Sequence, residues 1–85
     1  MAKRIKVDVT QRNIDAGYAN SCKSCPVALA LRRVFHTRDV DVDSFFMTVK
    51  GRAYMVTMDV LTFMSDFDRE QPVEPFTFYL DAIGG

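Results

Sequence analysis

Residues 22–31, Cys-Lys-Ser-Cys-Pro-Val-Ala-Leu-Ala-Leu, decide the fold that we predict for this chain of 85 residues. Proline is well tolerated in the first turn of a helix, because its missing N–H has no partner there in any case. Pro26 therefore predicts the start of a helix, with Cys25 as its N-cap. Apolar residues cover most of that helix through Leu31, so we expect a central element that ends near residue 36.

Alternating apolar and polar residues predict strands on both sides of this helix. The strands are expected at residues 5–9, 40–49 (with a bulge near Ser44), 53–58 and 76–80. Lys50-Gly51 is a hairpin signal between the second and the third strand.

Two further helices are expected. Thr10 can cap a short helix over residues 11–16, which Gly17 would end by adopting a positive φ. Asp59 can cap a longer helix that extends to residue 70, where apolar residues recur at helical spacing.

The order strand, helix, strand, strand, helix, strand predicts an α+β fold in a single domain, residues 1–85. We expect a ferredoxin-like β-α-β-β-α-β sandwich with an extra helical turn after the first strand. Its four-stranded antiparallel sheet would have both main helices on one face and would be open on the other. The predicted core comprises Val27, Ala30, Leu31, Val34, Val60, Phe63, Met64 and Phe67.

The net charge of zero hides a split between the two halves of the chain. Residues 1–38 contain eight Lys or Arg and two Asp, whereas residues 39–85 contain three Lys or Arg and nine acids. The charges either interleave on folding or form a basic and an acidic face. No apolar stretch approaches the ~20 residues of a membrane span, and no signal peptide is evident. We therefore expect a cytoplasmic protein without a membrane partner.

Cys22 and Cys25 are the only cysteines, and they supply two of the four ligands that structural zinc needs. The one histidine, His36, would lie ~16 Å from Cys25 at the far end of the helix, too far to complete the site. A complete site would need a nearby carboxylate such as Asp15, or a zinc ion shared by two chains. Redox chemistry and plain packing are the alternatives for this pair. No cofactor is otherwise expected.

Residues 50–56, Lys-Gly-Arg-Ala-Tyr-Met-Val, resemble the longer signature of RNA-recognition domains on the third strand. This segment has the glycine, the small residue and one of the aromatics of that signature. The other aromatic residues on which that family stacks bases are missing here. The alternative function is therefore an RNA-binding module that uses Lys6, Arg52 and Tyr54.

Several segments together resemble a group of small hypothetical proteins common in bacteriophage genomes. They are Val9-Thr10, Ile14-Asp15-x-Gly17, the cysteine motif with its helix, Phe67-Asp68, and Pro72-Val73-x-Pro75-Phe76-x-Phe78. The resemblance implies a phage setting, and it brings no assigned activity. Small phage proteins without catalytic residues often act by binding a host enzyme or the transcription machinery.

The sequence contains no evident nucleophile–base pair and no phosphate-binding loop, so we expect no enzyme. The predicted function is a small interaction protein that binds and modulates or inhibits a host protein, with a nucleic-acid-binding protein as one candidate. Homodimer formation is also considered. The predicted partner-binding residues are Asp39, Asp41, Asp43, Phe45, Tyr54 and Tyr79.

Overall fold

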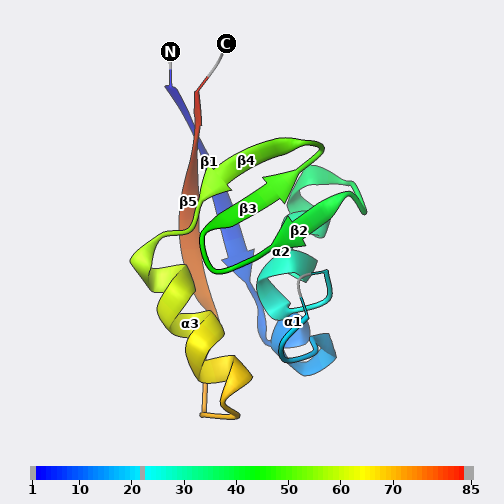
Figure 1. Cartoon of the computed structure of the whole chain (residues 1–85), viewed down its shortest axis with the longest axis vertical. Helices are drawn as coiled ribbons and strands as arrows, with labels where there is room; N and C mark the ends of the chain where they lie inside the picture. The colour runs from blue at the N-terminus through cyan, green and yellow to red at the C-terminus, as the bar shows by residue number, and fades with distance from the viewer. Residues whose placement is uncertain (1, 22, 84–85) are drawn as a thin grey trace.

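A computed structural model describes residues 2–21 and 23–83 as an α+β fold (Figure 1), which confirms the predicted class. The elements follow in the order β1 (Ala2–Val9), α1 (Gln11–Ala16), α2 (Pro26–Phe35), β2 (Val40–Val42), β3 (Phe46–Val49), β4 (Arg52–Met55), α3 (Met58–Asp68) and β5 (Phe76–Ile83).

The described strands form two antiparallel sheets. β1 pairs with β5 along its whole length, from Ala2 opposite Ile83 to Val9 opposite Phe76. β2, β3 and β4 form a three-stranded meander, which lies in front of β1 and α2 in Figure 1. A four-stranded ferredoxin-like sheet is not seen among the described strands, and that finer architecture stays a prediction.

The predicted single strand over residues 40–49 is two strands, because Asp43 starts a tight turn. One carboxylate oxygen of Asp43, Oδ1, accepts hydrogen bonds from the backbone N–H groups of Phe45 and Phe46, both at 2.7 Å. The N–H of Asp43 donates to the carbonyl oxygen of Phe46 at 2.9 Å, which closes the turn. An aspartate that hydrogen-bonds its own backbone in this way reverses the chain direction without glycine.

Helix α2 begins as predicted, with Pro26 in its first turn and Cys25 as its N-cap. The Sγ atom of Cys25 accepts a hydrogen bond from the N–H of Ala28 at 3.4 Å. His36 ends the helix in the left-handed conformation, at φ 52°, and its N–H donates to the carbonyl oxygen of Arg32. The helix packs against β1 of one sheet and β2 of the other, so it joins the two.

The caps of the other helices differ in part from those predicted. Thr10 caps α1 through a reciprocal pair of hydrogen bonds with Asn13. Helix α3 begins at Met58, so its N-cap is Thr57 and Asp59 lies inside the first turn. Gly17 has a φ of −79°, and therefore does not end α1 by a left-handed conformation.

One buried cluster draws side chains from both sheets and from helices α2 and α3. Five of the predicted core residues are buried in it, namely Val27, Ala30, Leu31, Val60 and Phe63. The other three, Val34, Met64 and Phe67, are partly buried against its edge. None of the helices in the described ranges has the length and apolar character that crossing a membrane requires.

Candidate functional site

The outward face of the β2–β3–β4 sheet follows from the alternation of its strands. Val42 and Met47 are paired and buried, so their neighbours along each strand point away from the core. Phe46 lies opposite Met55 on this outward face. The Asp43–Phe46 turn hydrogen bond places Asp43 at the β2 end of the same row.

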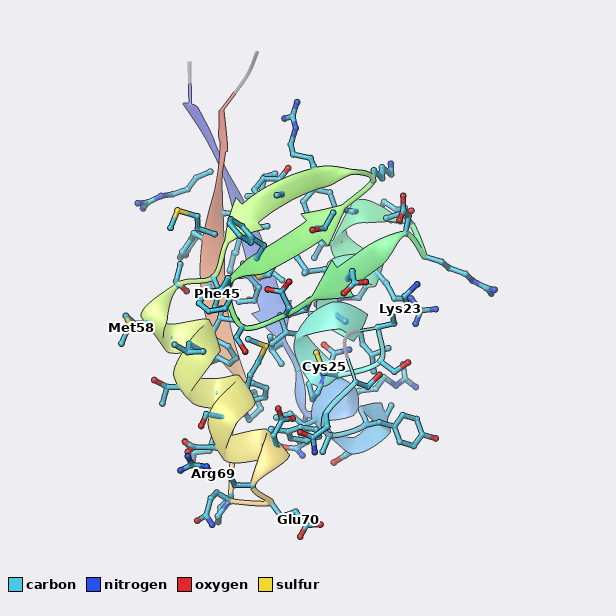
Figure 2. All side chains as sticks on the ribbon, viewed as in Figure 1. Lys23, Cys25, Phe45, Met58, Arg69 and Glu70 are labelled. Atoms are coloured by element: carbon cyan, nitrogen blue, oxygen red, sulfur yellow. The ribbon has the colours of Figure 1, made fainter. Side chains whose placement is uncertain are left out.

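Four large apolar side chains gather at the Phe46 end of this face. The side chains of Phe45, Met55 and Met58 are 74%, 76% and 74% exposed, and that of Phe46 is 47% exposed. The carbonyl oxygen of Phe45 accepts from the N–H of Val56 at 3.0 Å, which holds the turn beside the end of β4. Figure 2 shows Phe45 and Met58 near the N-terminal end of α3. We call Phe45, Phe46, Met55 and Met58 the apolar patch.

Three carboxylates follow β2 on this face, and Asp43, which is bonded to Phe46, is the one beside the apolar patch. Asp39, Asp41 and Asp43 are all exposed, and the strand alternation places them on the outward face. Asp41 pairs with Thr48, whereas the carboxylate of Asp43 is engaged by the turn. Backbone hydrogen bonds from Phe46 and, to a lesser extent, Phe45 lower the pKa of Asp43 below its ordinary value of 3.8.

The two predicted tyrosines lie elsewhere. Tyr54 pairs with buried Met47 and is half-buried, with its ring 6.2 Å from that of Phe35, so it points towards the core side of the sheet. Tyr79 lies on β5 in the other sheet, where the guanidinium of Arg4 sits 5.5 Å from the centre of its ring. The structure therefore groups Phe45 with the aspartates, and groups neither tyrosine with them.

The residues of the alternative RNA-binding function are divided between the sheets. Lys6 lies on β1, directly opposite Tyr79 on β5, and is exposed. Arg52 is exposed at the start of β4, opposite Val49, on the same side of the strand as Tyr54. A basic side chain beside an exposed aromatic ring is therefore found at Lys6 and Tyr79 rather than on β4.

Of the two cysteines, Cys22 lies outside the described residues, whereas Cys25 is buried at the start of α2. Asp15, the carboxylate considered as a third ligand, is exposed on α1 and accepts a hydrogen bond from Gln11 at 2.9 Å. Within residues 2–21 and 23–83, no three side chains of the types that bind metals form a candidate site.

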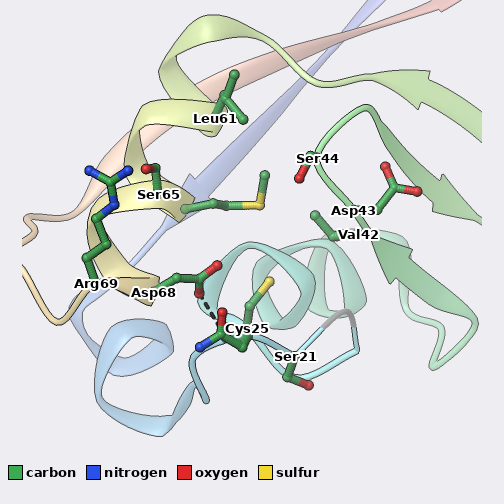
Figure 3. A pocket seen from close by; sticks show the side chains of 11 residues that line it. Ser21, Cys25, Val42, Asp43, Ser44, Leu61, Ser65, Asp68 and Arg69 are labelled. Carbon is green, nitrogen blue, oxygen red and sulfur yellow. Dashed lines mark hydrogen bonds between the residues drawn. The ribbon is translucent and has the colours of Figure 1, made fainter.

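Cys25 lines a pocket of about 550 Å³ between α3, the turn at Asp43 and the loop before α2 (Figure 3). The N–H of Asn20 donates to Oδ1 of Asp68 at 2.8 Å, which ties this loop to the end of α3. The lining contains acids, serines and Arg69 but no histidine. His36 lies at the opposite end of α2, so this pocket lacks the base that a Cys–His pair needs.

Sequence reasoning missed three members of the apolar patch, namely Phe46, Met55 and Met58. A strand over residues 40–49 places Phe45, Phe46 and Met47 in succession, and succession alone does not show which side chains face the core. The available signal was Asp43, because aspartate favours turns and a turn there resets the alternation of the following strand.

Comparisons of the chain with protein-family models, with curated proteins and with solved structures find no match.

Proposed function

We propose that this chain is a small, non-enzymatic interaction protein that binds another protein through its apolar patch. The observation that supports the proposal is the exposure of four large apolar side chains on one face of a small domain. Exposed apolar groups scattered singly are ordinary, whereas a contiguous group bordered by charges is typical of a protein-binding surface. Aromatic residues and methionine are enriched in such interfaces.

The border of the apolar patch indicates the chemistry of the partner. Asp43 places negative charge beside it, and Asp41 and Asp39 continue that charge along β2 away from it, each of the three being exposed. A matching surface would present an apolar centre with Lys or Arg at one edge. Surfaces of that composition are common on proteins that bind nucleic acid.

The resemblance to small phage proteins supports a setting in the cytoplasm of a bacterial host. In that setting the partner is a host protein, and occupation of its basic surface would block access of nucleic acid. The proposed action is therefore inhibition or modulation by binding, without a catalytic step or a cofactor.

A capture experiment with two matched variants tests this proposal. Phe46→Lys/Met55→Lys places two charges in the apolar patch, whereas Tyr18→Lys changes a residue outside it that is 71% exposed. We expect the wild type and Tyr18→Lys to capture the same host protein from a nuclease-treated lysate in stoichiometric amounts. The double variant should capture at least about tenfold less of it.

Three outcomes would contradict the proposal. Equal capture by all three proteins would exclude the apolar patch as the binding surface. Recovery of nucleic acid alone, before nuclease treatment, would favour the RNA-binding alternative, with Lys6, Arg52 and Tyr54 as the residues to substitute. A concentration-dependent dimer in analytical ultracentrifugation that the double variant abolishes would make the apolar patch a self-interface.

A further inference from the structure

A groove of about 680 Å³ runs beside α3, on the face of the helix that points away from the cysteine pocket. Its apolar lining comes from Phe63 and Phe76, whose ring centres lie 4.7 Å apart, together with Val73 and Met58. The volume falls within the range of about 300–1,000 Å³ that is typical of ligand sites. Met58 belongs to both the groove and the apolar patch, so the two surfaces are continuous.

The charged side chains that line this groove are all acidic. Asp59 and Asp66 project from α3, Glu74 comes from the segment before β5, and none of the described residues that line it is Lys, Arg or His. The cysteine pocket differs in this respect, because Arg69 stands there among its acids. An apolar floor between carboxylates is complementary to a ligand that has both apolar and cationic groups.

We propose that the groove binds a short basic segment of the partner protein, with two cationic side chains on its acidic walls and an apolar one on its floor. The proposal rests on the proposed function, since the segment belongs to the same partner that covers the apolar patch. The guanidinium group of arginine fits such walls well, because it can donate two parallel hydrogen bonds to one carboxylate.

The spacing of the carboxylates sets the spacing of the basic residues. Asp59 and Asp66 are seven residues apart on α3, a rise of about 10 Å along the helix axis. In the polyproline II conformation, residues three apart point to the same side and are separated by about 9 Å. The expected segment therefore has the pattern Arg-x-x-Arg, in which at least one of the two residues between the arginines is apolar.

The test uses fluorescence polarisation with a labelled peptide, acetyl-Gly-Arg-Leu-Pro-Arg-Gly-amide, and the full chain. Asp59→Asn/Glu74→Gln removes two charges from the groove. Asp15→Asn/Glu70→Gln removes two charges of the same kinds from exposed residues that do not line it. We expect the groove variant to raise the Kd about tenfold or more and the control variant to change it less than about twofold.

A second peptide checks the spacing at constant composition. Acetyl-Gly-Arg-Arg-Leu-Pro-Gly-amide has the same charge with adjacent arginines, and we expect it to bind at least about fivefold more weakly. Backbone amide resonances should change at Thr62, Asp66 and Val73 when the first peptide binds, and those of Phe46 should stay in place.

The proposal is overturned if both charge variants weaken binding equally, if the adjacent-arginine peptide binds as tightly, or if no binding is seen. Resonance changes confined to Asp39–Asp43 would also overturn it, while leaving the apolar patch as the site of the proposed function. A dimer that Asp59→Asn/Glu74→Gln dissociates would overturn it by identifying a second copy as the occupant. If the apolar patch does not bind the partner, Phe46→Lys/Met55→Lys would capture as much of the host protein as the wild type does. That result is separate from the peptide measurements.

Discussion

Gly17 and Pro26 lie so close together that a Cβ atom on Gly17 would be 2.6 Å from Cδ of Pro26 and 2.7 Å from its Cγ. The glycine sits at the end of α1, and the proline opens α2. Because the φ of Gly17 is −79°, any residue could adopt its backbone conformation. The glycine is required by the close approach of two helix ends, not by the turn itself.

Gly17→Ala is therefore expected to destabilise the protein by about 1–3 kcal/mol, since the added methyl group has no room. Urea denaturation measures the loss. Gly51→Asn is the contrasting variant, because Gly51 has a φ of +80° and nothing within 4 Å of an added Cβ. Asparagine tolerates that conformation, so its cost should stay within about 1 kcal/mol. Equal costs for the two variants would contradict the steric explanation.

Leu31→Ala should cost about 2–5 kcal/mol, because the side chain is fully buried where α2 packs against both sheets. Leu61→Ala on α3 removes the same atoms from a side chain that is 38% exposed, and should cost clearly less. Thermal denaturation of the two variants under identical conditions gives the comparison. A smaller loss for Leu31→Ala than for Leu61→Ala would show that α2 is not the centre of the core.

The lowered pKa of Asp43 links the stability of the Asp43–Phe46 turn to pH. A carboxyl group with a lower pKa in the native state binds its proton more weakly there than in the unfolded chain. Its contribution is present in full above the unfolded-state pKa, the ordinary value of 3.8, and is lost as the pH falls through the native value. Asp43→Asn keeps an acceptor oxygen but has no charge to titrate.

The urea midpoint of the wild type should therefore exceed that of Asp43→Asn above about pH 4, and the two should converge at lower pH. A carbon-13 titration of the Asp43 carboxyl group gives the native pKa directly. A midpoint difference that stays constant from about pH 2 to pH 6 would show that the charge of Asp43 does not stabilise the turn.

Substitution of Cys25 separates its role as a helix cap from thiol chemistry. Serine is a preferred N-cap residue, so Cys25→Ser should keep the acceptor for the N–H of Ala28 and retain α2. Cys25→Val fills similar space without an acceptor and should cost about 1 kcal/mol more. Circular dichroism and thermal denaturation of the two variants test this difference. Equal stability of both would show that the sulfur does not act as a cap.

Elemental analysis of protein purified without chelators tests the metal prediction, and we expect no zinc. About one zinc ion per two chains would contradict this and indicate a dimer with four shared thiolates. One zinc ion per chain would point to additional ligands, with Asp15 the first to substitute.

The parts of the fold that local chemistry determines were predictable from the sequence. Pro26 and the apolar run after it place α2 correctly, and Lys50-Gly51 forms the predicted hairpin, with both residues at positive φ. The turn at Asp43 was not predicted, because its reversal depends on one carboxylate that accepts two backbone hydrogen bonds rather than on a glycine. That turn decides the whole candidate site, since it sets which of Phe45, Phe46 and Met47 face outwards.

The division into two sheets is harder to predict for a different reason. Strand patterns show which residues alternate, but the partner of each strand is selected by packing across the core, far along the chain. The groove beside α3 was missed for the same reason, because Glu74 meets Asp59 and Asp66 only after β5 has packed beside the helix.

The pairing of β1 with β5 has a consequence for how this chain folds as it is synthesised. The two strands pair from Ala2 opposite Ile83 to Val9 opposite Phe76, so every contact between them spans most of the chain. Contacts between such distant residues form slowly, because a long loop must close first. While the ribosome makes the intervening residues, β1 has an unpaired edge that other chains can join. Completion of β5 is therefore the step that pairs this edge of β1.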